Sequence, residues 1–122
     1  MAKQKIRMGL IGCGGNMQRA HLPRLLADGG VDVVGVADPD ESQAQALFEE
    51  LGKETEFFED YRQLVRNVDL DAMLISSPHA LHYEQARLSL QKGLHVLIEK
   101  PLTIASRQTK SLINLSDKLK LY

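Results

Sequence analysis

The chain has 122 residues, of which 43% are hydrophobic and 25% charged, and its formal net charge is −1. This length and composition fit one domain with a core of its own. The balanced charge excludes an electrostatic case for binding nucleic acid or an anionic membrane surface, and no apolar run approaches the roughly 18 residues of a membrane span.

Five short apolar runs alternate along the chain with segments of helical periodicity. Most of the runs are continuously apolar, which is typical of strands that helices cover on both faces. The predicted strands are residues 6–11, 31–37, 57–58, 72–75 and 94–98. The predicted helices start near residue 21, after residues 40 and 60, at residue 79 and from residue 103. This alternation predicts right-handed βαβ units and a parallel sheet in an α/β fold.

Several residues mark where the helices start and stop. Asp40 and Asp60 each precede a helical pattern and are followed three residues later by a glutamine, which is the arrangement of a capping box. Gly93 is suited to end the helix before it. Pro23 cannot sit inside a regular helix, so we expect it in the first turn of the first helix.

Three glycines follow the first predicted strand in the stretch GLIGCGGNMQ. Gly12 would make the tight turn, and Gly14 would let the main chain approach a pyrophosphate at the N-terminus of the next helix. The dinucleotide-binding fingerprint asks for a third small residue where this chain has Met17. The glycines alone therefore also fit a tight strand-to-helix turn that binds nothing.

Asp38 strengthens the dinucleotide interpretation. It stands at the end of the second predicted strand, about 20 residues beyond the glycine turn, where this class of fold places an acid. A carboxylate there can accept hydrogen bonds from both hydroxyls of the adenosine ribose, and it repels a 2′-phosphate. We therefore predict NAD as the cofactor in preference to NADP. Asp40 is the weaker candidate for this role, because it is needed as a helix cap.

Two further stretches contain candidate functional residues. SSPHALHYEQA follows the fourth predicted strand, and EKP follows the fifth. Open parallel sheets bind ligands at the carboxyl ends of their strands. Glu99 and Lys100 could therefore face the reactive end of the cofactor, with Pro101 stiffening the turn. A solvated surface lysine remains the alternative for Lys100.

Taken in order, GLIGCGG…AHLP, VADPD, ISSPHALHYEQA and LIEKPL resemble the N-terminal domain of the Gfo/Idh/MocA oxidoreductases, over essentially the whole chain. The EKP tripeptide, with the serine–proline pair and the histidine before it, is far more specific than the glycine turn. The resemblance implies a nicotinamide-dependent enzyme that acts on sugars, polyols or related small molecules, with the cofactor carrying the hydride.

The family's pattern also implies roles for individual residues. Lys100 would be the catalytic lysine, whose ammonium hydrogen-bonds the reacting substrate oxygen and stabilises the charge that develops as hydride moves. Glu99 would approach the nicotinamide ribose and the substrate, and His82 would sit in the helix behind the middle of the cofactor. The full set of implied cofactor-binding residues is Gly12, Gly14, Gly15, Asn16, Met17, Asp38, Ser76, Ser77, Pro78, His82, Glu99 and Lys100.

Two features depart from the family's pattern. The stretch GCGGNMQRAH looks like a longer version of the turn, with one extra residue before the histidine that matches His21. The chain stops at KLKLY, about where a sixth strand would begin, whereas family members continue into a substrate domain that supplies an acid–base histidine. We therefore expect residues 1–122 to be a dinucleotide-binding domain only, with a three-layer α/β Rossmann fold built on a parallel sheet. Such a domain would bind cofactor weakly without turnover and would self-associate through its exposed sheet edge.

Other classes of protein are less consistent with the sequence. The lone cysteine, Cys13, cannot form an internal disulfide, which favours a reducing compartment and a cytoplasmic protein. No pair of histidines has the context of a metal site, so we predict no metal. Two other functions stay open: a non-catalytic nucleotide-binding module, regulatory or an engineered scaffold, and an adenosylmethionine methyltransferase, in whose chemistry EKP has no role. The sequence identifies neither the substrate nor the stereochemistry of hydride transfer.

Overall fold

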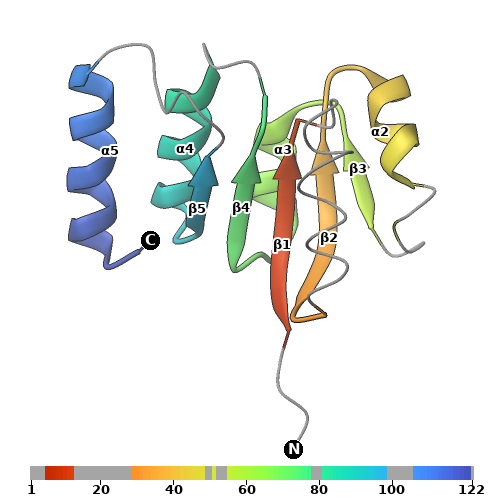
Figure 1. Ribbon diagram of the computed structural model, residues 1–122, viewed down its shortest axis with the longest axis horizontal. Coiled ribbons are helices and arrows are strands. Elements are labelled where there is room, and N and C mark those ends of the chain that lie inside the picture. The colour runs from red at the N-terminus through yellow and green to blue at the C-terminus, as the bar shows by residue number, and fades with distance from the viewer. Residues whose placement is uncertain are drawn as a thin grey trace, which may run out of the picture.

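The computed structural model describes residues 5–12, 29–48, 51, 55–77, 81–98 and 106–121. Its strands form one parallel sheet in the spatial order β3-β2-β1-β4-β5 (Figure 1). The strands are β1 (Ile6–Ile11), β2 (Val31–Ala37), β3 (Glu56–Phe58), β4 (Ala72–Ile75) and β5 (His95–Ile98). β1, β2 and β4 have the predicted bounds, whereas β3 begins one residue earlier than predicted and β5 one residue later.

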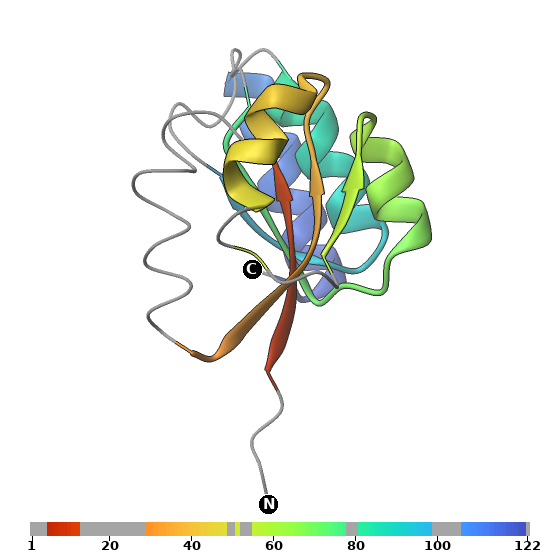
Figure 2. The same cartoon turned by 90° about the vertical axis from the view of Figure 1, so that its right-hand side faces the viewer.

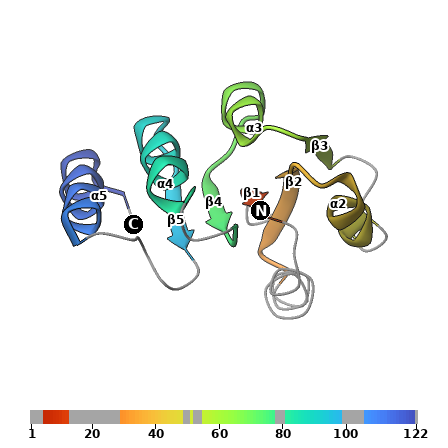
Figure 3. The ribbon, with the colours of Figure 1, turned by 90° about the horizontal axis from the view of Figure 1, so that it is seen from above.

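Helices lie on both faces of this sheet, as predicted for an α/β fold. The described helices are α2 (Glu41–Phe48), α3 (Tyr61–Asn67), α4 (His82–Gln91) and α5 (Ser106–Leu119). The strands run between α2 on one side and α3 on the other (Figure 2), and α4 covers the same face as α3 while α5 packs beside α4 (Figure 3). The predicted first helix, with Pro23, and the predicted start of α4 at residue 79 lie outside the described residues.

Apolar side chains are buried on both faces of the sheet. On the face covered by α3 and α4, Leu64 of α3 joins Met73 and Ile75 of β4 in the larger core cluster. On the opposite face, Leu10 of β1 and Leu74 of β4 belong to a second cluster. Because neighbouring residues of β4 point to opposite faces and both faces are covered, the strand reads as a continuous apolar run.

Both predicted aspartate caps are in place. The carboxylate of Asp60 accepts a hydrogen bond from the main-chain N–H of Arg62 at 2.9 Å. The carboxylate of Asp40 accepts from the N–H and the hydroxyl of Ser42, at 3.0 and 2.6 Å. These bonds from Ser42 hold the pKa of Asp40 below its ordinary value, so the cap stays ionised at neutral pH.

One edge of the described sheet is formed by β5. Its Leu97 is 60% exposed, which is unusual for a large apolar side chain in a strand. The self-association expected from an open sheet edge stays a prediction.

Replacing Asp60 with alanine removes the cap of α3 and should lower the free energy of unfolding by about 1 kcal/mol, measured by urea denaturation. Asp60→Asn should keep most of the stability, because an amide oxygen also accepts from the helix N–H. The exposed neighbour Glu59 provides a control, and Glu59→Ala should change stability by less than about 0.5 kcal/mol. Equal losses in Asp60→Ala and Glu59→Ala would contradict the capping role.

Candidate functional site

The carboxyl ends of β1, β2 and β4 lie next to each other at one rim of the sheet. The chain runs outward from β1 to β2 and β3 and then crosses back to β4 and β5, so the strand order reverses between β1 and β4. Open parallel sheets bind ligands at such a switch point. The residues that follow these three strands, Gly12, Asp38 and Ser76, all line one cleft there.

Main-chain hydrogen bonds continue past the strands and hold this rim together. The N–H of Gly12 donates to the carbonyl of Ala37 at 2.9 Å, and the N–H of Ser76 donates to the carbonyl of Ile11 at 2.8 Å. The N–H of Asp38 donates to the carbonyl of Phe58 at 3.1 Å. The candidate residues therefore stand on backbone that the sheet fixes, which suits a site that must be formed before its ligand arrives.

Gly12 is required by its neighbours as well as by its turn. Its φ is +91°, a left-handed conformation that side chains disfavour. A Cβ on Gly12 would lie 2.6 Å from the carbonyl carbon and oxygen of Ser76 and 2.7 Å from the nitrogen of Ser77. Both the positive φ and the close approach of the chain leaving β4 therefore require glycine here, and the sequence did not reveal the second cause. The rest of the predicted turn lies outside the described residues.

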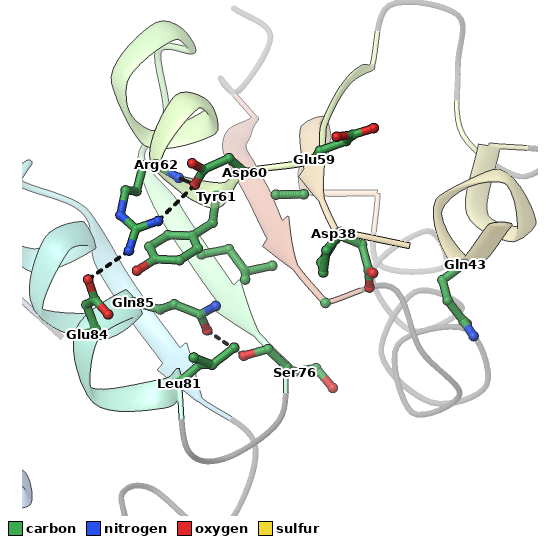
Figure 4. A pocket seen from close by; sticks show the side chains of 15 residues that line it. Asp38, Gln43, Glu59, Asp60, Tyr61, Arg62, Ser76, Leu81, Glu84 and Gln85 are labelled. Atoms are coloured by element: carbon green, nitrogen blue, oxygen red, sulfur yellow. Dashed lines mark hydrogen bonds and ion pairs between the residues drawn. The ribbon is translucent and has the colours of Figure 1, made fainter. Parts of the chain in front are cut away.

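The cleft at the switch point has a volume of about 560 Å³, which is in the range of small-molecule sites. Its walls come from the ends of β1, β2 and β4 and from the first turns of α3 and α4 (Figure 4). The lining residues are Ile11, Gly12, Ala37, Asp38, Pro39, Gln43, Glu59, Asp60, Tyr61, Arg62, Ser76, Ser77, Leu81, Glu84 and Gln85.

Asp38 is half-buried at the end of β2 and lines the cleft. One of its carboxylate oxygens, Oδ1, accepts from the main-chain N–H of Asp40 at 2.8 Å, which fixes the orientation of the side chain. Asp40 is itself ionised for the reason given above. Asp38 is therefore the acid that lines the cleft, whereas the carboxylate of Asp40 caps α2 and is not among the lining residues.

Ser77 is held from two sides by buried side chains of α4. Its hydroxyl donates to the side-chain oxygen of Gln85, and its carbonyl oxygen lies 2.7 Å from Nε2 of His82. His82 is 1% exposed and Gln85 is 2% exposed. His82 thus lies in α4 behind Ser77 and holds its main chain, while its place behind a cofactor stays a prediction.

Gln85 was missed by sequence reasoning, although a signal was present. The buried residues of α4 are His82, Gln85, Ala86, Ser89 and Leu90. This spacing marks one face of a helix, and three of its members are polar. Polar residues on the buried face of a helix require hydrogen-bond partners inside the protein, and they point to built polar sites.

Tyr61 and Arg62 form the wall of the cleft on α3. The guanidinium carbon of Arg62 lies 4.8 Å from the centre of the Tyr61 ring, and Nη2 of Arg62 lies 3.1 Å from Oε1 of Glu84 on α4. The Tyr61 hydroxyl oxygen is buried and has no hydrogen-bond partner among the described residues. Burial, with a contribution from the Glu84 carboxylate, raises the pKa of Tyr61, so the phenol keeps its proton at neutral pH.

The remaining predicted site residues lie outside the described residues, and their roles stay predictions. They are Gly14, Gly15, Asn16, Met17, Pro78, Glu99 and Lys100. Within the described part of the chain, no group of three or more His, Cys, Asp or Glu side chains could hold a metal ion. No helix among the described residues is long and apolar enough to span a membrane.

Comparison with known proteins agrees with this fold and this site. The model of a family described as "Oxidoreductase family, NAD-binding Rossmann fold" matches residues 6–122. The chain therefore belongs to the Gfo/Idh/MocA oxidoreductases, as the sequence motifs implied.

Individual relatives cover nearly all of this chain. D-glucoside 3-dehydrogenase of Escherichia coli strain K12 is 29% identical over 119 residues, which are 98% of this chain and 34% of that protein. The 3-ketoreductase KijD10 from Actinomadura kijaniata, solved with NADP and TDP-benzene, is 34% identical with a TM-score of 0.87, over 97% of this chain and 36% of that one. The WlbA dehydrogenase from Bordetella pertussis, solved with NADH and UDP-GlcNAcA, is 26% identical with a TM-score of 0.88, over 99% and 36%. This chain spans about a third of the length of these relatives.

Gly12→Ala should lower the free energy of unfolding through two effects: backbone strain at a positive φ, and collision of the new Cβ with the Ser76–Ser77 main chain. The collision should add about 1–3 kcal/mol to the loss that the positive φ causes. Gly93→Ala is a matched control, because Gly93 has a φ of +92° and nothing within 4 Å of an added Cβ. Urea denaturation of both variants separates collision with the Ser76 main chain from backbone strain. Equal losses of stability in Gly12→Ala and Gly93→Ala would contradict the contribution of the contact with the Ser76 main chain.

Proposed function

We propose that this chain binds a nicotinamide dinucleotide in the switch-point cleft and serves an oxidoreductase that acts on a sugar, a polyol or a related small molecule. The observation that carries the proposal is the pairing of Gly12 and Asp38 at the rim of one cleft. One residue removes a side chain where a diphosphate needs main chain, and the other supplies a carboxylate for a ribose. Bound there, the nicotinamide supplies or accepts the hydride.

The residues of the cleft fit the parts of such a cofactor. Gly12 packs closely on the Ser76–Ser77 main chain and carries no side chain there, which favours a diphosphate beside it. Asp38, oriented by the N–H of Asp40, would accept from the ribose hydroxyls next to it. Ser77, held by Gln85 and His82, would line the middle of the cofactor.

The charge at the end of β2 supports NAD as the preferred cofactor. A 2′-phosphate on the ribose would approach the carboxylate of Asp38, which lines the cleft, and like charges repel. Solved relatives include one with NADP and one with NADH. Family membership therefore leaves the choice open, and we assign it from the carboxylate of Asp38.

The catalytic part of the proposal rests on the family pattern. Lys100 would hold the reacting oxygen of the substrate through its ammonium and stabilise the negative charge that develops there. The names of the relatives, a glucoside dehydrogenase and a sugar ketoreductase, support a carbohydrate substrate. We propose that residues 1–122 act as the dinucleotide-binding domain, and that residues outside this chain complete the substrate site.

Titration with NADH and NADPH tests the cofactor assignment. The chain should bind NADH more tightly than NADPH. Asp38→Asn should weaken the binding of NADH by about 10-fold, because a charge-assisted hydrogen bond is lost. The same change should reduce the difference in affinity between NADH and NADPH. Glu41→Gln, which removes an equal charge from the exposed start of α2 outside the cleft, should leave the ratio unchanged. Tighter binding of NADPH by the wild-type chain would refute the assignment.

Incubation of the purified chain with NAD and a panel of sugars and polyols tests whether the chain binds cofactor without catalysing the reaction. We expect cofactor binding without turnover, followed through the absorbance of NADH, because the substrate contacts are proposed to lie elsewhere. Sugar-dependent production of NADH, lost again in Lys100→Ala, would show that the chain is a complete catalyst. Failure to bind either dinucleotide would remove the proposed function itself.

A further inference from the structure

A second groove lies between α3 and α4, which are neighbours on the same face of the sheet (Figure 3). It has a volume of about 370 Å³. Arg62 and Glu84 line both this groove and the switch-point cleft, so their ion pair separates the two spaces. The lining residues of the groove are Arg62, Val65, Arg66, Glu84, Arg87, Leu88, Gln91 and Lys92.

The helical repeat brings the polar members of this set to facing sides of the two helices. On α3, Arg62 and Arg66 are four residues apart and therefore lie on one face. On α4, Glu84, Arg87 and Gln91 are three and four residues apart and also share a face. Since all of them line one groove, charges that are distant in the sequence are gathered in one place.

The groove is basic, although the chain as a whole is not. Its lining includes four cationic side chains and one carboxylate, whereas the formal net charge of the chain is −1. The carboxylate belongs to Glu84, whose Oε1 is already paired with Nη2 of Arg62 at 3.1 Å. Among the described residues, no ion pair is formed by the exposed side chains of Arg66, Arg87 and Lys92. Three positive charges without a described counterion attract anions to the groove.

The helix dipoles account for only part of this charge. Arg66 is in the last turn of α3 and Lys92 is the C-cap of α4, where the dipole of a helix favours a cation. Arg87 lies in the middle of α4. Glu84, three residues before it on the same face, is paired with Arg62 instead. Nothing in the described part of the chain therefore gives Arg87 a structural role.

The floor of the groove is apolar and rests on the core. Val65 is 3% exposed, and Leu88 packs against the same core cluster. The volume lies at the lower end of the range of small-molecule sites. Guanidinium groups present paired N–H groups that match the oxygens of phosphate. Arginines on both sides of a small groove are thus suited to hold a compact phosphate-bearing anion.

We propose that the groove between α3 and α4 binds a small oligophosphate. Its phosphate chain bridges Arg66 of α3 and Arg87 of α4, and Lys92 adds a third positive charge. Axes of packed helices are roughly 8–10 Å apart, so an anion must be several atoms long to reach both sides at once. None of these three residues lines the switch-point cleft, and the inference does not depend on the proposed function.

Isothermal titration calorimetry with inorganic tripolyphosphate tests the proposal. The wild-type chain should bind it with a Kd below about 1 mM at about 0.15 M salt, and higher salt should weaken the binding. Arg66→Gln and Arg87→Gln should each raise the Kd by about 10-fold, because a charge-assisted hydrogen bond is lost. The melting temperature of the free chain should stay the same, because neither side chain loses an ion-pair partner.

Arg107→Gln makes the same chemical change on α5, outside the groove, and should keep the wild-type Kd. Absence of tripolyphosphate binding, or binding that survives in the double variant Arg66→Gln/Arg87→Gln, would overturn the oligophosphate site. An equal loss in Arg107→Gln would also overturn it, because the anion would then respond to overall charge alone.

A titration of tripolyphosphate in saturating NADH separates the groove from the cleft. The Kd should not change, whereas displacement by NADH would place the anion in the cleft and overturn the inference. Guanosine triphosphate, titrated under the same conditions, identifies the source of the phosphate chain. A Kd equal to or above that of tripolyphosphate indicates a free oligophosphate, and a lower Kd indicates a nucleotide whose base uses the apolar floor. Binding of NADH alone is measured separately, so this site and the proposed function can fail independently.

Discussion

The whole site depends on one contact between main chains, where Gly12 meets the carbonyl of Ser76 and the nitrogen of Ser77. No side chain fits between them, because a Cβ on Gly12 would lie within 2.7 Å of the peptide group that joins Ser76 to Ser77. This approach brings the exits of β1 and β4 together at the point where the sheet reverses its strand order. Around Gly12 the cleft is therefore bounded by main chain, and side chains from the strand ends and from α3 and α4 line the rest of it.

Much of the fold could be predicted because its physical causes are local. The carboxyl-terminal halves of β1 and β2 and most of β4 are buried, and their apolar runs have clear ends. The bounds of the two outer strands were less certain. Glu56 enters β3 through main-chain pairing with Gly35, despite its charge. Leu94 stays out of β5 because its N–H donates to Ser89 at the end of α4.

The site was predictable only in part, for the same reason. Gly12 and Asp38 follow strands at a spacing that carries a known requirement, so the sequence located them. Tyr61 and Gln85 belong to different helices and meet only because α3 and α4 cover the same face of the sheet. Neither position, taken alone in the sequence, indicates that it faces a cleft. Their shared cleft is a property of the tertiary structure that a single sequence does not contain.

The first turn of α3 contributes both to the stability of the helix and to the cleft. Asp60 caps the helix, and Tyr61 beside it lines the cleft. Transient fraying of this turn and escape of a bound molecule would therefore disturb the same few residues. A molecule bound in the cleft stabilises the folded form of this turn by mass action, because it binds only when the turn is folded. Amide protons at the start of α3 would then exchange with solvent more slowly in the complex, whereas those of α5, on the far side of α4, would respond little.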